Sequence, residues 1–224
     1  MIQELKRCFK LFRYAYGLKA NVVGAVFMFL VALSCIFFGS FMNLTGYVVS
    51  AICMFISFVV IVQLKDNYLF SGLVMSSPRK RCLEIGLTDL LILIAGIGSY
   101  LLNGLLVFLL RNSQTYKDAS LASIFLVAGI EITTFIIDYG FANRYYVFSM
   151  VMMISGYFFV GFWGSDEYLS KIGSLVGHNA VYGFLAGGAI VVVGVLLSMG
   201  IRRLLYKKPL SLHVGSMGLR KAMQ

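Results

Sequence analysis

The sequence predicts an all-α integral membrane protein with six transmembrane helices. Hydrophobic residues make up 60% of the 224 residues and charged residues only 12%, a balance far from that of a soluble domain. Six apolar runs are each close to the roughly 20 helical residues that cross about 30 Å of hydrocarbon. The runs are Val22–Phe41, Leu44–Val62, Gly86–Leu110, Ala119–Tyr139, Tyr145–Trp163 and Ala180–Ile201.

The positive charges sort by side when the connections between these runs are numbered alternately. Of the 19 lysines and arginines, all but Arg111, Lys117 and Lys171 fall on one side. Because Lys and Arg beside membrane spans are retained in the cytoplasm, we expect both termini and the second and fourth loops to be cytoplasmic. An odd number of spans would destroy this sorting. We therefore expect a multi-pass protein of a bacterial cell (plasma) membrane.

The net charge of +10 would indicate nucleic acid as the partner of a soluble chain. Here the excess is explained by the cytoplasmic topology signal and by attraction to anionic lipid head groups. We expect the lipid bilayer as a partner and no nucleic acid.

The first element is an amphipathic elbow helix over residues 1–20. Lysines and arginines occupy one side of it, so it would lie in the cytoplasmic interface of the membrane. It serves either as an anchor that orients the first span or as a lever that touches a cytoplasmic partner. The other side carries apolar residues at intervals of three and four: Ile2, Leu5, Phe9, Phe12 and Tyr16.

A short cytoplasmic helix is expected between the second and third spans. After Gln63 the chain is too apolar for a solvated linker, but its apolar residues are too few to cross a bilayer. Pro78 ends this helix, because the residue before a proline avoids the α conformation. The third span begins near Gly86. The residues that characterise this segment are Tyr68, Phe70, Leu73, Met75, Pro78 and the basic triplet Arg79, Lys80 and Arg81.

Three carboxyl groups fall inside predicted spans, where a charge is costly and usually faces protein or water. Asp89 lies just inside the third span, and we expect it to remain solvated or to pair with Arg81. Asp138 lies near the cytoplasmic end of the fourth span and is expected to pair with Arg144. Glu131, near the middle of that span, is a proton-linked group, a substrate contact or a carboxyl kept neutral by desolvation.

Small residues in the last span indicate close helix packing. Gly183 and Gly187 are four residues apart and Gly188 follows, a spacing that lets helix backbones approach. The sequence leaves open whether this face meets a helix of the same chain or of a second subunit. The preceding loop, Gly164–Asn179, is amphipathic and forms either a lid over a pathway or an interfacial cap.

The domain organisation is that of one transmembrane domain, 1–224, with a six-helix bundle over 22–201 and a basic cytoplasmic tail over 202–224. The stretches outside the spans are too short to bury a core of their own. The 4 cysteines and 2 histidines show no metal-ligand spacing, so we expect no metal site. An intramembrane hydrolase would need Ser/His or His/Glu pairs within the bilayer, and both histidines are loop residues. We expect no catalytic residues.

This arrangement resembles the permease subunits of the ABC-2 type exporters. Those subunits have an elbow helix, six spans, both termini inside, and a coupling helix between spans two and three. That helix is often followed by a Leu-Pro-x-Ser-Arg/Lys-like turn. Here Met75-Ser-Ser-Pro-Arg-Lys80 stands in the equivalent place. The proline directly precedes the arginine, and Met75 replaces the usual leucine.

The resemblance implies a transport subunit driven by a separate ATP-binding cassette ATPase. The sequence has no Gly-x-x-x-x-Gly-Lys-Ser/Thr phosphate loop, so this chain binds no cofactor, and ATP and Mg²⁺ belong to the partner. Two permease subunits, as a homodimer or a heterodimer, would pair around a pathway for an amphipathic or hydrophobic cargo (a peptide, lipid or drug). ATPase closure would push on the coupling helix, Asn67–Pro78, and on the basic triplet beside it.

Two other functions stay open. A substrate-binding membrane component of an ATP-driven importer can also have six spans and an external ATPase. Such proteins usually lack an N-terminal elbow helix. A structural scaffold without transport would not account for a dedicated cytoplasmic helix between spans two and three.

Overall fold

The protein is described here by a computed structural model that covers residues 18–37, 45–69, 81–110, 118–142, 144–163, 171–172, 174–177 and 179–209. Within these ranges the fold is all-helical, as predicted, with six α-helices and no strand. A single π-helical turn, η2 (Cys82–Leu87), leads directly into α5. The helices are α2 (Leu18–Phe37), α3 (Thr45–Leu69), α5 (Thr88–Leu110), α6 (Asp118–Ala142), α7 (Tyr146–Trp163) and α9 (Ala180–Leu205).

Four of the helical segments are long and apolar enough to cross a membrane. They are Lys19–Phe37, Glu84–Leu109, Leu121–Ala142 and Ala180–Leu205. In α3 the apolar stretch among the described side chains is Gly46–Val60, and the helix itself continues to Leu69. The four long segments are consistent with a membrane protein, and six crossings stay a prediction.

Two helices continue beyond the predicted span ends. The second span was expected to end before a separate helix beginning at Asn67, but α3 runs unbroken to Leu69. No glycine or proline interrupts α3 after Gly46, so nothing in the backbone ends it at the membrane surface. Likewise α9 continues to Leu205, so Arg202 and Arg203 are helical residues and not the start of a tail.

The elbow helix, expected over residues 1–20, lies outside the described residues except for 18–20, which belong to α2. The segment 70–80 and the end of the tail, 210–224, also lie outside them.

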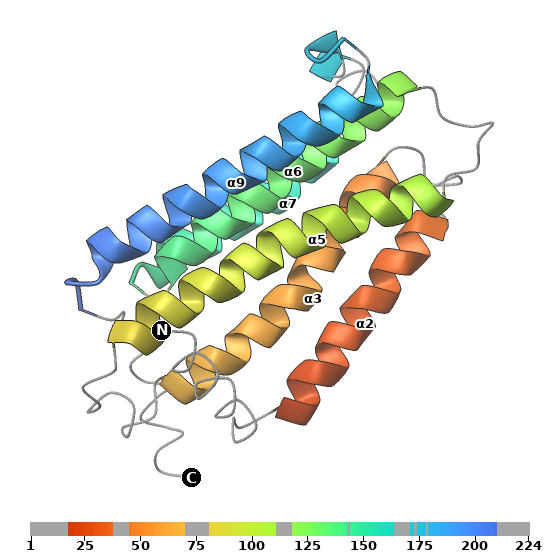
Figure 1. Cartoon of the computed structure of the whole chain (residues 1–224). Helices are drawn as coiled ribbons and strands as arrows, with labels where there is room; N and C mark the ends of the chain where they lie inside the picture. Colours follow the sequence, from red (N-terminus) through yellow and green to blue (C-terminus); the bar gives the residue numbers. More distant parts are fainter. Residues whose placement is uncertain are drawn as a thin grey trace.

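The helices form a bundle in which α2 lies at one edge beside α3, and α5 runs through the middle (Figure 1). On the other side, α6 packs along α9 and against α7. The core centres on α6, where every residue from Leu121 to Gly129 is buried. The rings of Phe55 on α3 and Phe135 on α6 lie 6.3 Å apart and join the two halves of the bundle.

The outer faces of the bundle are apolar. Val23 on α2 is 68% exposed, Val147 on α7 is 77% exposed, and Leu185 on α9 is 61% exposed. Long apolar faces of this kind are costly in water, and hydrocarbon removes that cost. The bundle is therefore organised as a membrane protein is, with large side chains directed outward.

Candidate functional site

A cluster of charged side chains joins three parts of the chain at one end of the bundle. It lies where η2 enters α5, where α9 ends, and where α6 turns into α7. Its charged members are Arg81, Glu84, Asp89, Arg144, Arg202 and Arg203, and the ring of Tyr206 lies beside two of these arginines.

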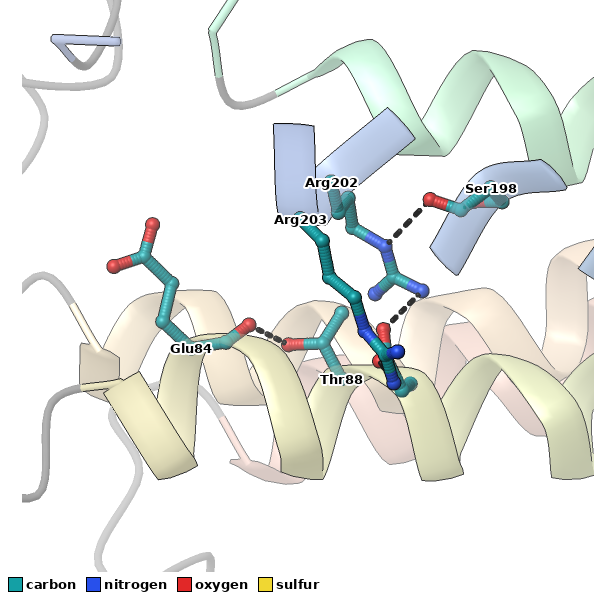
Figure 2. Close-up of polar contacts among 6 residues, drawn as sticks. Glu84, Thr88, Ser198, Arg202 and Arg203 are labelled. Atoms are coloured by element: carbon teal, nitrogen blue, oxygen red, sulfur yellow. Dashed lines mark hydrogen bonds and ion pairs between the residues drawn. The ribbon is translucent and has the colours of Figure 1, made fainter. Parts of the chain in front are cut away.

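Asp89 faces two consecutive arginines of α9, and Figure 2 shows these two arginines, Arg202 and Arg203, in close-up. The Nη2 atom of Arg202 lies 2.8 Å from Oδ1 of Asp89, and the Nη2 atom of Arg203 lies 3.3 Å from Oδ2. The side chains of Asp89 and Arg202 are each 8% exposed, whereas that of Arg203 is 66% exposed. The Nε of Arg202 also donates to the backbone carbonyl of Ser198 at 3.4 Å. The start of α5 is thus held to the end of α9 by a nearly buried ion pair.

A second ion pair lies one turn earlier, in η2. The Nη2 atom of Arg144 lies 2.5 Å from Oε1 of Glu84, and both side chains are nearly buried. The same nitrogen donates to the backbone carbonyl of Tyr206 at 3.4 Å. The guanidinium groups of Arg144 and Arg81 each lie 5.9 Å from the centre of the Tyr206 ring, within the range of cation–π attraction. The turn between α6 and α7 is thereby tied to η2 and to the end of α9.

A side-chain hydrogen bond from Thr88 accompanies the π-helical turn η2. Its Oγ1 donates to the carbonyl of Glu84 at 2.6 Å, as drawn in Figure 2. Backbone carbonyls in a π turn lose their regular α-helical partners, and a threonine hydroxyl four residues later can take their place. The turn therefore presents Glu84 to Arg144 at the beginning of the helix that carries Asp89.

These pairings differ from the predicted ones. Asp89 contacts Arg202 and Arg203 and not Arg81, because α9 continues a turn further than the sequence indicated. Arg144 pairs with Glu84 and not with Asp138. Glu84 was not among the predicted residues, although an acidic residue three positions after a basic triplet and before an apolar run was a signal for it.

Glu131 and Asp138 lie on one face of α6. They are seven residues apart, two helical turns, and are 4% and 7% exposed. Gly129 and Thr133 lie on the opposite face and contact α9, where the Thr133 hydroxyl donates to the Ile190 carbonyl at 3.0 Å. The ion pairs that the structure shows are instead those of Glu84 and Asp89. The structure thus buries both groups inside the subunit, on the side of α6 away from α9.

The glycines of the last span pack within the chain. A Cβ atom added to Gly183 would lie 2.5 Å from Cα of Ala122 on α6, and Gly187 is in similarly close contact with α6. Gly188 faces the ring of Tyr100 on α5, whose hydroxyl donates to the Phe184 carbonyl at 2.8 Å. This glycine face therefore meets helices of the same subunit. The sequence had left open whether it meets the same chain or a second subunit.

Of the predicted coupling residues, Tyr68 and Arg81 are among the residues that the structure describes. Phe70, Leu73, Met75, Pro78, Arg79 and Lys80 lie outside the described residues, and Tyr68 belongs to the last turn of α3. Arg81 is described and contacts Tyr206. Of the predicted lid, Ile172 is buried and Leu175 is 81% exposed.

No metal centre is formed by the part of the chain that the structure describes, since no three His, Cys, Asp or Glu residues gather there. Comparisons of the chain with protein-family models, with curated proteins and with solved structures give no match.

Proposed function

We propose that this chain is the membrane-spanning permease subunit of an ATP-driven exporter of the ABC-2 type. In this proposal all six helices cross the bilayer, both termini are cytoplasmic, and a separate ATPase chain supplies the energy. The observation that carries the proposal is the charged cluster. It begins at Arg81, the last residue of the basic triplet that follows the expected coupling helix and the residue that precedes η2.

The cluster connects the expected coupling segment to the bundle, so that a displacement of this segment would be transmitted to several helices. Glu84 links η2 to the turn between α6 and α7, and Asp89 links α5 to α9. Coupling between distant sites is carried by contacts of this kind between rigid elements. A displacement of residue 81 would therefore move α5, α9 and the turn at Arg144 together.

The helix on the other side of the coupling segment supports the same function. α3 extends over 25 residues, about 37 Å of helix, which is longer than the roughly 30 Å hydrocarbon layer. Its last residues, Lys65 to Leu69, would project into the cytoplasm as a continuous rod. The coupling segment would then be held between two rigid helices.

The cargo in this proposal is amphipathic or hydrophobic and passes along a route formed by two subunits. The outward faces of α2, α7 and α9 are apolar and suit such a cargo better than a hydrated ion. Glu131 and Asp138 are buried inside the subunit, so a cargo would reach them only if a helix packed against α6 moved away.

The first test is to solubilise the protein from its native membrane and to identify what co-purifies. We expect a stoichiometric ATP-binding cassette subunit. Its loss on changing Arg79, Lys80 and Arg81 together to Glu would place the contact on the basic triplet. Lys171→Glu is the control, because it reverses a charge at the opposite end of the bundle. The proposal fails if no nucleotide-binding chain co-purifies and the triple charge reversal leaves the protein's activity unchanged.

Topology is tested separately by labelling single cysteines with a membrane-impermeant maleimide in intact cells, in a variant whose 4 native cysteines are replaced. A cysteine at Lys171 should react from outside, and one at Lys80 should react only after lysis. The reverse result at either position would overturn the predicted membrane topology, on which the proposed exporter function depends.

A further inference from the structure

One face of α9 carries a stripe of exposed apolar side chains. Val181, Leu185, Val192 and Leu196 are 59%, 61%, 42% and 61% exposed. Their spacing of four, seven and four residues places them on the same side of the helix. Seven residues after Leu196, on that same side, comes the 66% exposed side chain of Arg203.

The charge at the end of this stripe is only partly neutralised. Asp89 is a single carboxylate that faces two guanidinium groups, and the buried Arg202 approaches it more closely than Arg203 does. Lys207 and Lys208 follow within the next turn and are both exposed. Arg203, Lys207 and Lys208 therefore place exposed positive charge at the end of the stripe, which suits an anionic partner.

The backbone beside Arg203 is open. Gly200 lies three residues before it, and a Cβ atom added there would meet nothing within 4 Å. A bulky side chain at this position would cover the helix between Leu196 and Arg203. The glycine instead leaves a bare surface at the level where the apolar stripe changes to positive charge.

The part of the stripe nearest Arg203 fits one lipid leaflet. From Val192 to Arg203 there are eleven residues, a rise of about 16 Å along the helix. Half of a bilayer's hydrocarbon core is about 15 Å thick. An acyl chain lying on Val192 and Leu196 would thus bring its phosphate to the guanidinium of Arg203, which offers donors that match phosphate oxygens.

We propose that this face of α9 binds an anionic phospholipid, with an acyl chain along the stripe and the head-group phosphate at Arg203. The site depends on the bundle lying in a membrane, and it does not depend on coupling to an ATPase. A negatively charged lipid is preferred to a zwitterionic one, because the choline or ethanolamine cation of a zwitterionic lipid would meet the surplus positive charge.

The test measures which lipids the purified protein retains from detergent micelles containing equal amounts of phosphatidylglycerol and phosphatidylcholine, by native mass spectrometry. The wild-type chain should retain phosphatidylglycerol in preference. Arg203→Gln should lower that preference roughly fivefold, the effect of one basic residue at an anionic membrane surface. Because Arg202 still pairs with Asp89 in this variant, its thermal unfolding midpoint should stay close to that of the wild type.

Lys171→Gln is the matched control, since it removes an exposed lysine at the other end of the bundle, and it should keep the wild-type preference. The site is overturned if the wild type shows no preference for phosphatidylglycerol or if Arg203→Gln retains it in full. Displacement of the lipid by millimolar inorganic phosphate would show a free-anion site instead. Disulfide cross-linking of Leu196→Cys between two chains in the native membrane would show that a second copy covers the stripe. Either result refutes the lipid site.

Discussion

The contact between α6 and α9 predicts opposite effects for the same substitution at two glycines of one helix. Gly183 lies against the backbone of α6, where an added Cβ would be 2.5 Å from Cα and 2.7 Å from the carbonyl oxygen of Ala122. Gly200, on the same helix, has nothing within 4 Å of its Cβ position. Gly183→Ala therefore introduces a methyl group that the neighbouring backbone must yield to, and Gly200→Ala introduces one into open space.

The size of the effect follows from these distances. Carbon atoms in favourable contact are about 3.5–4.0 Å apart, so α6 and α9 would have to separate by about 1 Å at Gly183. Overpacking of this kind costs about 1–3 kcal/mol. Both variants gain the helix propensity of alanine over glycine, about 1 kcal/mol, and this term cancels between them. The difference in unfolding free energy between the two variants should therefore be about 1–3 kcal/mol, with Gly183→Ala the less stable.

The assay is reversible unfolding in mixed micelles by titration with sodium dodecyl sulfate. Helix content is followed by circular dichroism, and the single tryptophan, Trp163, provides an independent fluorescence signal. We expect Gly183→Ala to unfold at a lower detergent fraction than Gly200→Ala. If the two variants unfold together, α6 and α9 do not approach as closely as described, and the explanation of the glycine face is wrong.

Two further predictions concern side chains that join distant parts of the bundle. Glu84→Gln removes the acidic partner of the nearly buried Arg144 and should lower the unfolding free energy by about 3–5 kcal/mol. The double variant Glu84→Arg with Arg144→Glu should recover most of the loss in the same titration, and an undiminished loss would show that the ion pair is not the cause. Tyr100→Phe removes the hydroxyl that donates to the Phe184 carbonyl, and should cost about 0.5–1.5 kcal/mol in thermal unfolding. An unchanged midpoint would mean that this hydrogen bond contributes nothing to the joining of α5 and α9.

The helical class of this protein and the approximate positions of its helices were determined by the sequence alone. Six apolar runs predicted six helices, and each run overlaps one helix of the structure. The reason is that long apolar runs, and the breaks between them, are local features of the chain. The close-packing glycines Gly183 and Gly187 were recognised for the same reason, since their spacing places them on one face of α9.

The pairing of charges was decided only by the tertiary structure. Glu84 and Arg144 are 60 residues apart in the chain, and Asp89 and Arg203 are 114 residues apart. Which side chains meet depends on how far each helix extends and on how the helices are rotated about their axes. Neighbours in the sequence predicted solvent or Arg81 as the partner of Asp89, and Asp138 as the partner of Arg144. The extension of α9 past the predicted end of its span brought Arg202 to Asp89 instead, because packing and side-chain pairing, and not hydropathy, set where that helix ends.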